Sequence, residues 1–445
     1  MPKRIISCLC LFPLLFSLIG CKDTSSAETQ GLYHTVPTEA TTESTVNETS
    51  DTTPTQPETE PTQGETEPQP TEPEVIPDNI WTPLCNEYIY LRSQPGGGET
   101  LSEIPLGEHL TFEQWSGKYA LVTYNGMQGY VSANYIMPAD EAYFAKRLQV
   151  ISPTCQYSYQ QLLTDIEALQ ERYPGLVHRA SIGESELGRE IPVIKIGNPN
   201  AKRQVLMQGA IHGREYFTAW LLMAIADHSL AEGYLSGNDI CYHIIPMSNP
   251  DGVTLSQTMQ LNDTQAEIYQ SDLNLEYTTY DSATYAKKWK SNALGIDLNR
   301  NFPSGWSESW EHPLPSSERY RGGQPLCAAE SAALAEYTLD NSFDATVSFH
   351  SHGSVIYYRY GNKEPVNSLS FSFAKAIAQI TGYTPIQYDG TTGAGYKDWA
   401  MDELGIPSLT LEIGSFTTPL ETRDMYNTFA RFENLLPAID QWLQA

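Results

Sequence analysis

From Cys155 to Ala445, short apolar segments of strand length alternate with segments of helical periodicity, and this alternation limits the folds open to the chain. Tyr159–Arg172 predicts an amphipathic helix, because its apolar residues recur on one side. The candidate strands are Ile191–Ile196, Val205–Ile211, Cys241–Pro246, Ala345–His350 and Ser408–Ile413. Short, nearly all-apolar strands with helices between them favour an α/β fold with a central mixed, mostly parallel sheet flanked by helices. Ligands of such folds bind beyond the carboxyl ends of the strands, so the residues after each apolar run are the candidates for a site.

The first residues have the form of a secretion signal. Lys3 and Arg4 precede an apolar run of 15 residues, Ile5 to Ile19, which is short for a membrane span. The run ends in Leu-Ile-Gly before Cys21 and resembles the lipobox of bacterial lipoproteins, in which the cysteine is acylated. We therefore predict a lipoprotein signal over residues 1–21 and a lipid anchor at the extracellular face of a bacterial membrane. A plain signal peptide with an incidental cysteine is the alternative.

A stretch rich in Thr, Pro and Glu follows, over residues 22–78. It lacks the apolar surface that would offset the entropy of an ordered chain, so we expect a disordered linker. Proline and like charges keep such a chain extended at roughly 3 Å per residue, which gives a reach on the order of 150 Å. That reach would carry a domain from the membrane into a cell wall.

The formal net charge of −28 is unevenly distributed along the chain. Residues 1–78 hold 13 acidic and 3 basic residues, and the remainder holds 41 acidic and 23 basic residues. Nucleic acid is therefore not expected as a partner, because a phosphate-binding surface needs clustered Lys and Arg. A polyanionic wall polymer would also be repelled at long range, so binding to a wall depends on local contacts.

Four cysteines remain in the part predicted to be exported: Cys85, Cys155, Cys241 and Cys327. None forms a Cys-x-x-Cys pair, so a thiolate zinc knuckle is not supported. The four thiols could form two disulfides in any of three pairings, or none, and the sequence leaves this open.

Residues 79–138 alternate apolar and polar side chains between glycine-rich turns, which predicts a small all-β domain. The Asn125-Gly126 turn after Tyr119–Tyr124 is a strong hairpin signal. The order of these segments resembles the bacterial SH3 (SH3b) domain over its whole length, which implies an SH3-like barrel. In that family the module often binds peptidoglycan. A barrel that serves only as a spacer is the alternative, and the ligand stays open.

Candidate metal ligands follow two of the expected strands. His212 and Glu215 form a His-x-x-Glu motif after the strand Val205–Ile211, and His350 ends the strand Ala345–His350. Imidazole and carboxylate groups that face one point suit zinc. An isolated histidine at a strand end is more often a core residue bonded to a backbone carbonyl, so the spacing alone leaves both interpretations open.

Glu412 lies between Leu411 and Ile413 in the last expected strand. An ionised glutamate in a buried strand is costly unless a cation or hydrogen bonds compensate for its burial. A structural ion pair would satisfy it. Beside a metal it would instead be a general base for the attacking water.

Several separated motifs lie between Ile182 and Glu412. They are Ile182-Gly183-Glu184-Ser185 with Gly188-Arg189, His212-Gly213-Arg214-Glu215, Asn249-Pro250-Asp251-Gly252, Gly295-Ile296-Asp297-Leu298-Asn299-Arg300-Asn301-Phe302, Phe349-His350-Ser351, Asp398-Trp399 and Leu411-Glu412. In this order they resemble the zinc metallocarboxypeptidase (carboxypeptidase A-like) family, and the resemblance extends over nearly all of Tyr157 to Leu443. It implies one Zn²⁺ in the catalytic domain, held by His212, Glu215 and His350, with one coordination place left for water.

The same resemblance implies roles for four more residues. Glu412 matches the general base, which takes the proton of the attacking water and returns it to the leaving amine. Asp297 matches the carboxylate that orients the first histidine ligand. Asn299 and Arg300 match the pair that binds the free carboxylate of the substrate, for which a guanidinium group is well shaped.

Two positions depart from the family pattern. Lys290 stands where an arginine usually stabilises the oxyanion, and a lysine supplies the charge without the bidentate fork. The surrounding Trp-Lys-x-Asn resembles bacterial γ-D-glutamyl-diamino acid peptidases of the family, although a solvated surface lysine is the alternative. Lys397 occupies the position that tends to set side-chain preference, where a cation would favour a carboxylate-bearing side chain. Tyr388 is chosen as the substrate-capping tyrosine although the loop after it differs in length, and His352 is expected beside the ligands and not among them.

These features together predict an exported zinc metallopeptidase that acts as a monomer, with its catalytic domain over residues 155–445. The anchor, the linker and the SH3b-like domain point to peptidoglycan stem peptides, most of all the γ-D-glutamyl-diaminopimelate bond. A carboxypeptidase that releases C-terminal residues from nutrient peptides is the enzymatic alternative. An inactive surface protein that binds the cell wall is the alternative from another class, and the complete ligand set with Glu412 speaks against it. Internal versus terminal cleavage and the identity of the diamino acid stay open.

Overall fold

The structure is a computed structural model that describes residues 79–445 except for 84–87, 106–107, 140–142, 310, 389, 391–392, 415–417 and 421. The predicted signal with Cys21, the linker of residues 22–78 and Cys85 lie outside the described residues. Within the described part of the chain, no helix has both the length and the apolar character needed to cross a membrane. Cys155, Cys241 and Cys327 are described, and no two of them are joined to each other.

The first described segment is an all-β domain made of one curled sheet. Its elements are β1 (Ile80–Pro83), β2 (Tyr88–Gln94), β3 (Gly97–Pro105), β4 (Leu110–Ser116), β5 (Tyr119–Tyr124), β6 (Met127–Ser132), η1 (Ala133–Tyr135) and β7 (Ile136–Pro138). The strand order is β3-β2-β6-β5-β4-β1-β7, and each strand is antiparallel to its neighbours. The predicted Asn125-Gly126 turn joins β5 to β6, and both residues have positive φ, as the tight hairpin turn requires. This half-barrel is consistent with an SH3b-like domain.

The second described segment is a large α/β domain. Its elements are α1 (Tyr143–Arg147), α2 (Tyr159–Arg172), β8 (Val177–Glu184), β9 (Glu190–Gly197), β10 (Arg203–Gln208), η2 (Gly213–Glu215), α3 (Phe217–Ala231), β11 (Ile240–Ile245), α4 (Pro250–Thr258), α5 (Asp263–Asn274), α6 (Ser282–Lys287), η3 (Leu298–Arg300), η4 (Trp306–Glu308), α7 (Ala329–Asp340), β12 (Ala345–Ser351), β13 (Val355–Tyr357), α8 (Val366–Thr381), β14 (Thr384–Ile386), α9 (Tyr396–Asp402), β15 (Ser408–Ile413), α10 (Thr422–Phe432) and α11 (Leu435–Gln444). Strands and helices alternate along most of it, as the sequence predicts.

The sheet of this domain is mixed, with a parallel centre. Its order is β14-β13-β15-β12-β10-β11-β9-β8, in which β15, β12, β10 and β11 run parallel to one another. The strand β9 is antiparallel to β11 and to β8, and β13 is antiparallel to β15. The four parallel strands are almost entirely buried, which explains their nearly continuous apolar sequences.

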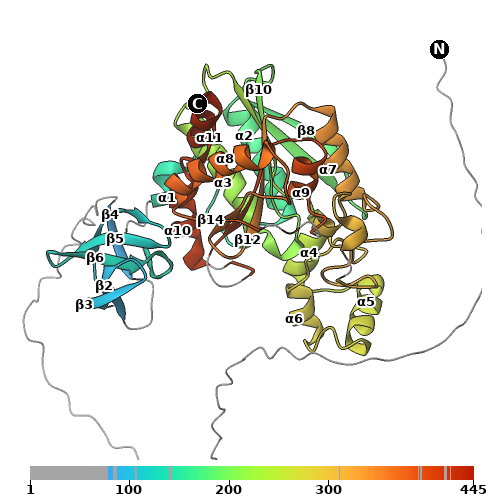
Figure 1. Ribbon diagram of the computed structural model, residues 1–445, viewed down its shortest axis with the longest axis horizontal. Coiled ribbons are helices and arrows are strands. Elements are labelled where there is room, and N and C mark those ends of the chain that lie inside the picture. The colour runs from blue at the N-terminus through green and yellow to red at the C-terminus, as the bar shows by residue number, and fades with distance from the viewer. Residues whose placement is uncertain are drawn as a thin grey trace, which may run out of the picture. The chain divides into compact units, whose positions relative to one another are not determined.

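Helices cover both faces of the sheet (Figure 1). On one face, α2, α3, α8, α10 and α11 pack around Val205 and Met207 of β10. On the other face, α7 and α9 pack around Leu206, which points the opposite way because side chains alternate along a strand. The parallel strands therefore end at the same edge of the sheet, and the candidate metal ligands and Glu412 lie at this edge.

A buried carboxylate fixes the segment that enters the α/β domain. Asp227, in the C-terminal half of α3, accepts hydrogen bonds from the backbone N–H groups of Gln149, Val150 and Ile151 at 2.8, 2.7 and 2.9 Å. The carboxylate thus binds three successive backbone donors, of which the N–H of Ile151 is buried. The start of the domain is thus tied directly to its central helix.

Candidate metal centre

The turn after β10 places the first two candidate ligands. The predicted strand Val205–Ile211 ends at Gln208 in the structure, and Ala210 has a positive φ of 46°, so the chain leaves the sheet before His212. A Cβ on Gly213 would lie 2.4 Å from the carbonyl carbon of Gly252, which leaves room only for glycine in this turn. The ligands are therefore carried on a short η2 turn that packs directly against the backbone.

The third candidate ligand and the candidate general base lie side by side on the sheet. His350 of β12 and Glu412 of β15 are direct partners in the parallel register of these two strands. Residues paired in this way project from the same region of the sheet. The strand pairing therefore brings together an imidazole and a carboxyl that are far apart in sequence.

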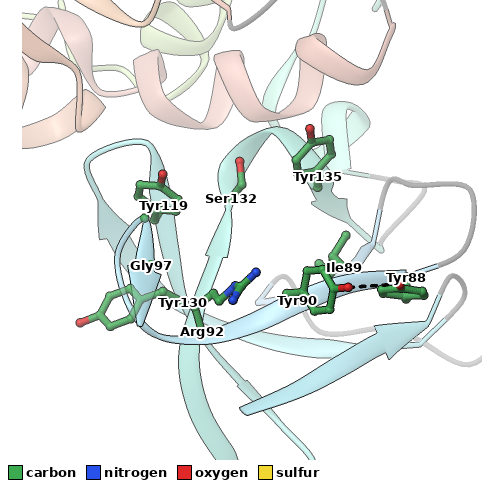
Figure 2. Close-up of a pocket in the computed structure, with 10 residues that line it drawn as sticks. Tyr88, Ile89, Tyr90, Arg92, Gly97, Tyr119, Tyr130, Ser132 and Tyr135 are labelled. Atoms are coloured by element: carbon green, nitrogen blue, oxygen red, sulfur yellow. Dashed lines mark hydrogen bonds between the residues drawn. The ribbon is translucent and has the colours of Figure 1, made fainter. Parts of the chain in front are cut away.

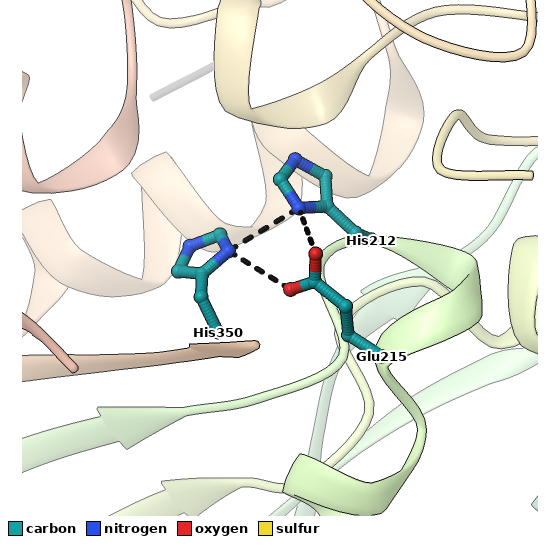
Figure 3. Close-up of side chains that lie close together, drawn as sticks. All are labelled: His212, Glu215 and His350. Atoms are coloured by element: carbon teal, nitrogen blue, oxygen red, sulfur yellow. Dashed lines mark hydrogen bonds and ion pairs between the residues drawn. The ribbon is translucent and has the colours of Figure 1, made fainter. Parts of the chain in front are cut away.

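His212, Glu215 and His350 converge on one point (Figure 3). Their potential ligand atoms all lie within 4.8 Å of one another, and the three residues are buried. The Nδ1 atom of His212 is 2.9 Å from Oε1 of Glu215, and the Nδ1 atom of His350 is 3.1 Å from Oε2 of the same carboxylate. The two Nδ1 atoms are 3.2 Å apart.

This arrangement fits a metal ion. Two imidazole nitrogens and a carboxylate that face one another in a buried place offer their lone pairs to the same small volume. Two histidines with one carboxylate form a ligand set of catalytic zinc sites, which keep one further coordination position open. The three residues would hold Zn²⁺, as the sequence predicts.

Asp297 stands behind the first histidine. Its Oδ1 atom is 3.3 Å from Nε2 of His212 and accepts the backbone N–H of Asn299 at 3.1 Å, and its Oδ2 atom accepts the N–H of Arg319 at 2.9 Å. Carboxylates in this position fix the tautomer and the orientation of a ligating imidazole. Burial by itself lowers the pKa of His212, but the carboxylates of Glu215 and Asp297 outweigh it and raise the pKa to about 9. The same carboxylates would favour a metal cation at this point.

The carboxyl of Glu412 is partly buried beside this centre. Burial raises its pKa, the neighbouring His350 opposes that shift, and the charge of Glu215 adds to it. A carboxyl whose pKa is moved upward from its usual range is suited to accept a proton and to give it back.

The predicted carboxylate-binding residues line a cavity of about 270 Å³ that contains Glu412. Asn299, Arg300, Tyr388 and Lys397 all border it. Arg300 donates from Nε to Oε1 of Glu311 at 3.0 Å, so a substrate carboxylate would share this guanidinium with Glu311. Tyr388 is 60% exposed, which leaves its ring room to move over a bound substrate.

Lys397 is more constrained than its sequence position indicates. It is buried at the start of α9, its Nζ donates to the carbonyl of Arg359 at 2.9 Å, and it forms an ion pair with Asp398. A substrate side chain would therefore meet a lysine whose charge is already balanced. Its predicted role in specificity stays a prediction. Arg359 borders the same cavity and is a third cation there, beside Arg300 and Lys397, that the sequence did not single out.

The backbone of Lys290 contacts the metal-ligand turn, and its charge acts on Asp297. Its carbonyl accepts the N–H of Gly213 at 2.9 Å, and its Nζ is 3.5 Å from Oε2 of Glu318. Its charge contributes to lowering the pKa of Asp297, although His212 contributes more. The backbone of Lys290 is thus held at the ligand turn. Its side chain would have to break the ion pair with Glu318 in order to contact a substrate.

One other predicted motif has a structural role. Asn249 donates to the carbonyls of Ile211, Lys290 and Ser291 at 3.0 to 3.2 Å, and so joins the ligand turn to the Lys290 segment. His352 is exposed and does not belong to the group of potential ligand atoms. Glu311 was missed, because a glutamate in an irregular loop gives no pattern in the sequence.

A separate groove of about 430 Å³ lies on the SH3b-like domain (Figure 2). Five tyrosines and one arginine border it: Tyr88, Tyr90, Tyr119, Tyr130, Tyr135 and Arg92. Arg92 lies over the ring of Tyr90 with its guanidinium carbon 4.7 Å from the centroid. Tyrosines supply apolar area together with hydroxyl groups, which suits an amphipathic ligand.

The fold and the converging ligands define a mononuclear metallohydrolase. The sequence pattern of the zinc carboxypeptidases, Peptidase_M14, matches residues 162–439, and the chain belongs to this family. It is therefore a zinc metallopeptidase, and its catalytic domain has the fold predicted from the sequence.

Two curated relatives and one solved structure illustrate the similarity. The chain is 32% identical over 277 residues to "Gamma-D-glutamyl-L-diamino acid endopeptidase 1" of Lysinibacillus sphaericus, covering 59% of this chain and 67% of the relative. It is 26% identical over 348 residues to carboxypeptidase B of Bos taurus, covering 72% and 76%. Bovine thrombin-activatable fibrinolysis inhibitor in complex with tick carboxypeptidase inhibitor superposes with a TM-score of 0.50 at 22% identity, covering 64% of this chain and 97% of that chain. That last comparison shows the fold alone.

Proposed function

We propose that this peptidase hydrolyses peptidoglycan stem peptides at the amide bond between a γ-D-glutamyl residue and a diamino acid such as diaminopimelate. The observation that carries the proposal is the 32% identity to an enzyme whose name specifies a γ-D-glutamyl-L-diamino acid bond. The Trp-Lys-x-Asn sequence at Lys290 adds to it, because a lysine replaces the usual arginine of the family there.

The arrangement of the residues supports a hydrolytic mechanism. His212, Glu215 and His350 would hold a Zn²⁺ ion, which would supply polarisation of the scissile carbonyl and a lowered pKa of the attacking water. Glu412 takes a proton from the attacking water and gives it to the leaving amine, so that the amide and water become a carboxylate and an amine. Arg300 positions the substrate through its free carboxylate, and Lys290 supplies positive charge where the carbonyl oxygen becomes negative.

The second candidate is a carboxypeptidase that releases C-terminal residues from peptides. Arg300 in the cavity beside Glu412 favours it equally, because such substrates also offer a free carboxylate. The 26% identity to carboxypeptidase B is in line with this candidate.

The test compares γ-D-glutamyl-diaminopimelate with acylated dipeptides as substrates for the chain without its signal. We expect cleavage of the first, loss of cleavage with a chelator, and loss of nearly all cleavage with Glu412→Gln. Glu232→Gln, at an exposed position, is the matched control and should keep full activity. Cleavage of the acylated dipeptides alone would support the carboxypeptidase, and cleavage of neither would support an inactive binding protein.

We also propose that the protein acts at the outer face of a bacterial membrane, anchored by lipid on Cys21. A spacer and an SH3b-like domain with a tyrosine-lined groove suit an enzyme that works within a wall. Cys21→Ala should move the protein from the membrane fraction to the medium. Retention of this variant in the membrane fraction would contradict the anchor.

A further inference from the structure

A second cavity of the catalytic domain, of about 310 Å³, is bordered by Lys290. The α5 and α6 helices and the segment 311–319 border it, and its lining includes Arg214, Tyr277, Tyr280, Lys288, Lys290 and Arg319. The globular part of the chain is acidic, so four basic side chains around one cavity are a local exception. Such a concentration indicates a place for an anionic group.

The acidic residues of this cavity already have partners. Asp272 is buried and accepts hydrogen bonds from the hydroxyls of Tyr285 and Ser316. Glu318 pairs with Arg319 at 3.4 Å and with Lys290 at 3.5 Å. These acids therefore neutralise part of the positive charge but not all of it.

Arg214 and Lys288 are the cations of this cavity that have no ion pair among the described residues, and Arg214 is held by a hydrogen bond to the backbone of Lys288. Lys288 is the one whose ammonium donates no hydrogen bond within the described part of the chain. It makes no ion pair with any residue of the described part of the chain, and its ammonium lies 5.2 Å from the centroid of the Tyr280 ring. The side chain is half-buried, so an anion bound here would be partly shielded from water. The carbonyl of Lys288 also accepts a hydrogen bond from Nη1 of Arg214 at 3.3 Å, which fixes its backbone beside the metal-ligand turn.

Glu311 connects this cavity to the one that contains Glu412. It borders both, and its carboxylate joins Arg300 on one side, at 3.0 Å, to Arg319 on the other, at 3.7 Å. Arg300 marks the side on which the leaving amine would be held. Arg300 does not border the cavity at Lys288, which is bordered instead by Lys290, the residue assigned to the carbonyl oxygen of the scissile bond. We therefore infer that this cavity lies on the acyl side of the bond to be cut.

We propose that this cavity binds the acyl side of the substrate and that Lys288 recognises a free carboxylate on the residue that supplies the scissile carbonyl. The inference rests on the proposed function and refines it. A glutamyl residue linked through its side-chain carbonyl keeps its α-carboxylate free, a few bonds from the scissile carbon. An ordinary peptide linked through α-carbonyls has no such charge at that position, so Lys288 selects the γ-linkage.

The test uses two dipeptides that differ in one group: γ-D-glutamyl-diaminopimelate and the same compound with its glutamyl α-carboxylate converted to a carboxamide. We expect the native enzyme to prefer the carboxylate by about tenfold in kcat/KM, as a charge-assisted hydrogen bond allows. Lys288→Met should abolish the preference by raising KM for the carboxylate substrate, with cleavage of the carboxamide unchanged. Lys288→Arg should keep the preference. Lys287→Met, at the exposed neighbouring lysine, is the matched control and should behave as the native enzyme.

Equal hydrolysis of the two dipeptides by the native enzyme would overturn the inference and leave the proposed function standing. A preference that persists in Lys288→Met would also overturn it. Hydrolysis of neither dipeptide, with cleavage of acylated dipeptides, would instead overturn the proposed function on which the inference rests.

Discussion

Replacement of Asp297 by asparagine separates metal binding from chemistry. The carboxylate contacts Nε2 of His212 and the backbone N–H groups of Asn299 and Arg319. An asparagine keeps the shape of the side chain and one oxygen, but an NH₂ group replaces the other oxygen. This NH₂ must face either the His212 ring and the N–H of Asn299 or the N–H of Arg319, all of which contact a carboxylate oxygen in the native chain. The His212 ring therefore loses a negative partner or the backbone loses an acceptor, and the ring is held less firmly toward the metal.

The expected magnitude follows from this role. Partners that orient a ligating histidine contribute about 10–100-fold to metal affinity, which corresponds to about 1.4–2.7 kcal/mol. The buried position of Asp297, 1% exposed, places the effect toward the upper end, because water cannot replace the lost contact. We expect the zinc Kd of Asp297→Asn to rise within this range, and activity to return when zinc is added in excess.

The assay is competition for zinc against a chelator of known affinity, followed by activity at increasing free zinc. Asp263→Asn, at the exposed start of α5, is the matched control and should bind zinc as the native chain does. An unchanged Kd in Asp297→Asn would refute the orienting role. Lost activity that excess zinc fails to restore would show that Asp297 acts in the chemical step instead.

Two further predictions concern buried positions of the catalytic domain. Gly213→Ala should remove most zinc binding and activity, since its Cβ would meet the backbone of Gly252 at 2.4 Å and no side-chain rotation relieves a contact between backbones; native-like zinc content would contradict this. Burial raises the pKa of Glu330 to about 7, against the pull of its hydrogen bond from Asn292, so the folded state holds this proton more tightly than the unfolded state. Stability from this group is complete below its unfolded pKa of about 4.5 and falls as pH rises to about 7, by about 3 kcal/mol in total. Glu330→Gln should flatten this part of the pH dependence in urea unfolding between pH 5 and 8, and an unchanged slope would argue against it.

The central strands and the long helices were predictable because their sequences leave few alternatives. The helix Tyr159–Arg172 and the strand Ser408–Ile413 have the predicted bounds, since each has a clear apolar period or a continuous buried run. The strands β8, β13 and β14 were not predicted. They lie at or near the sheet edges, where partly exposed and polar residues weaken the pattern.

The ligands were predictable from motifs, but their surroundings were not. His350 and Glu412 meet because of a strand register that no local sequence pattern encodes. The ion pair of Lys397 with Asp398 changes what that lysine can offer a substrate, and only the three-dimensional structure places it. Glu311 and Lys288 likewise could not be singled out from the sequence, because their proposed roles depend on the cavities that they border.

The three backbone N–H groups held by Asp227 also determine where tension along the chain would reach the enzyme. A pull on residues 149–151 would reach α3 at Asp227, ten residues beyond Phe217, where the helix begins after the ligand turn. Because this helix is buried on all sides, its neighbours in the core would share the force before it deformed the ligand turn. If the protein is anchored by lipid as we propose, this buried helix would separate force on the chain from the geometry of the metal ligands.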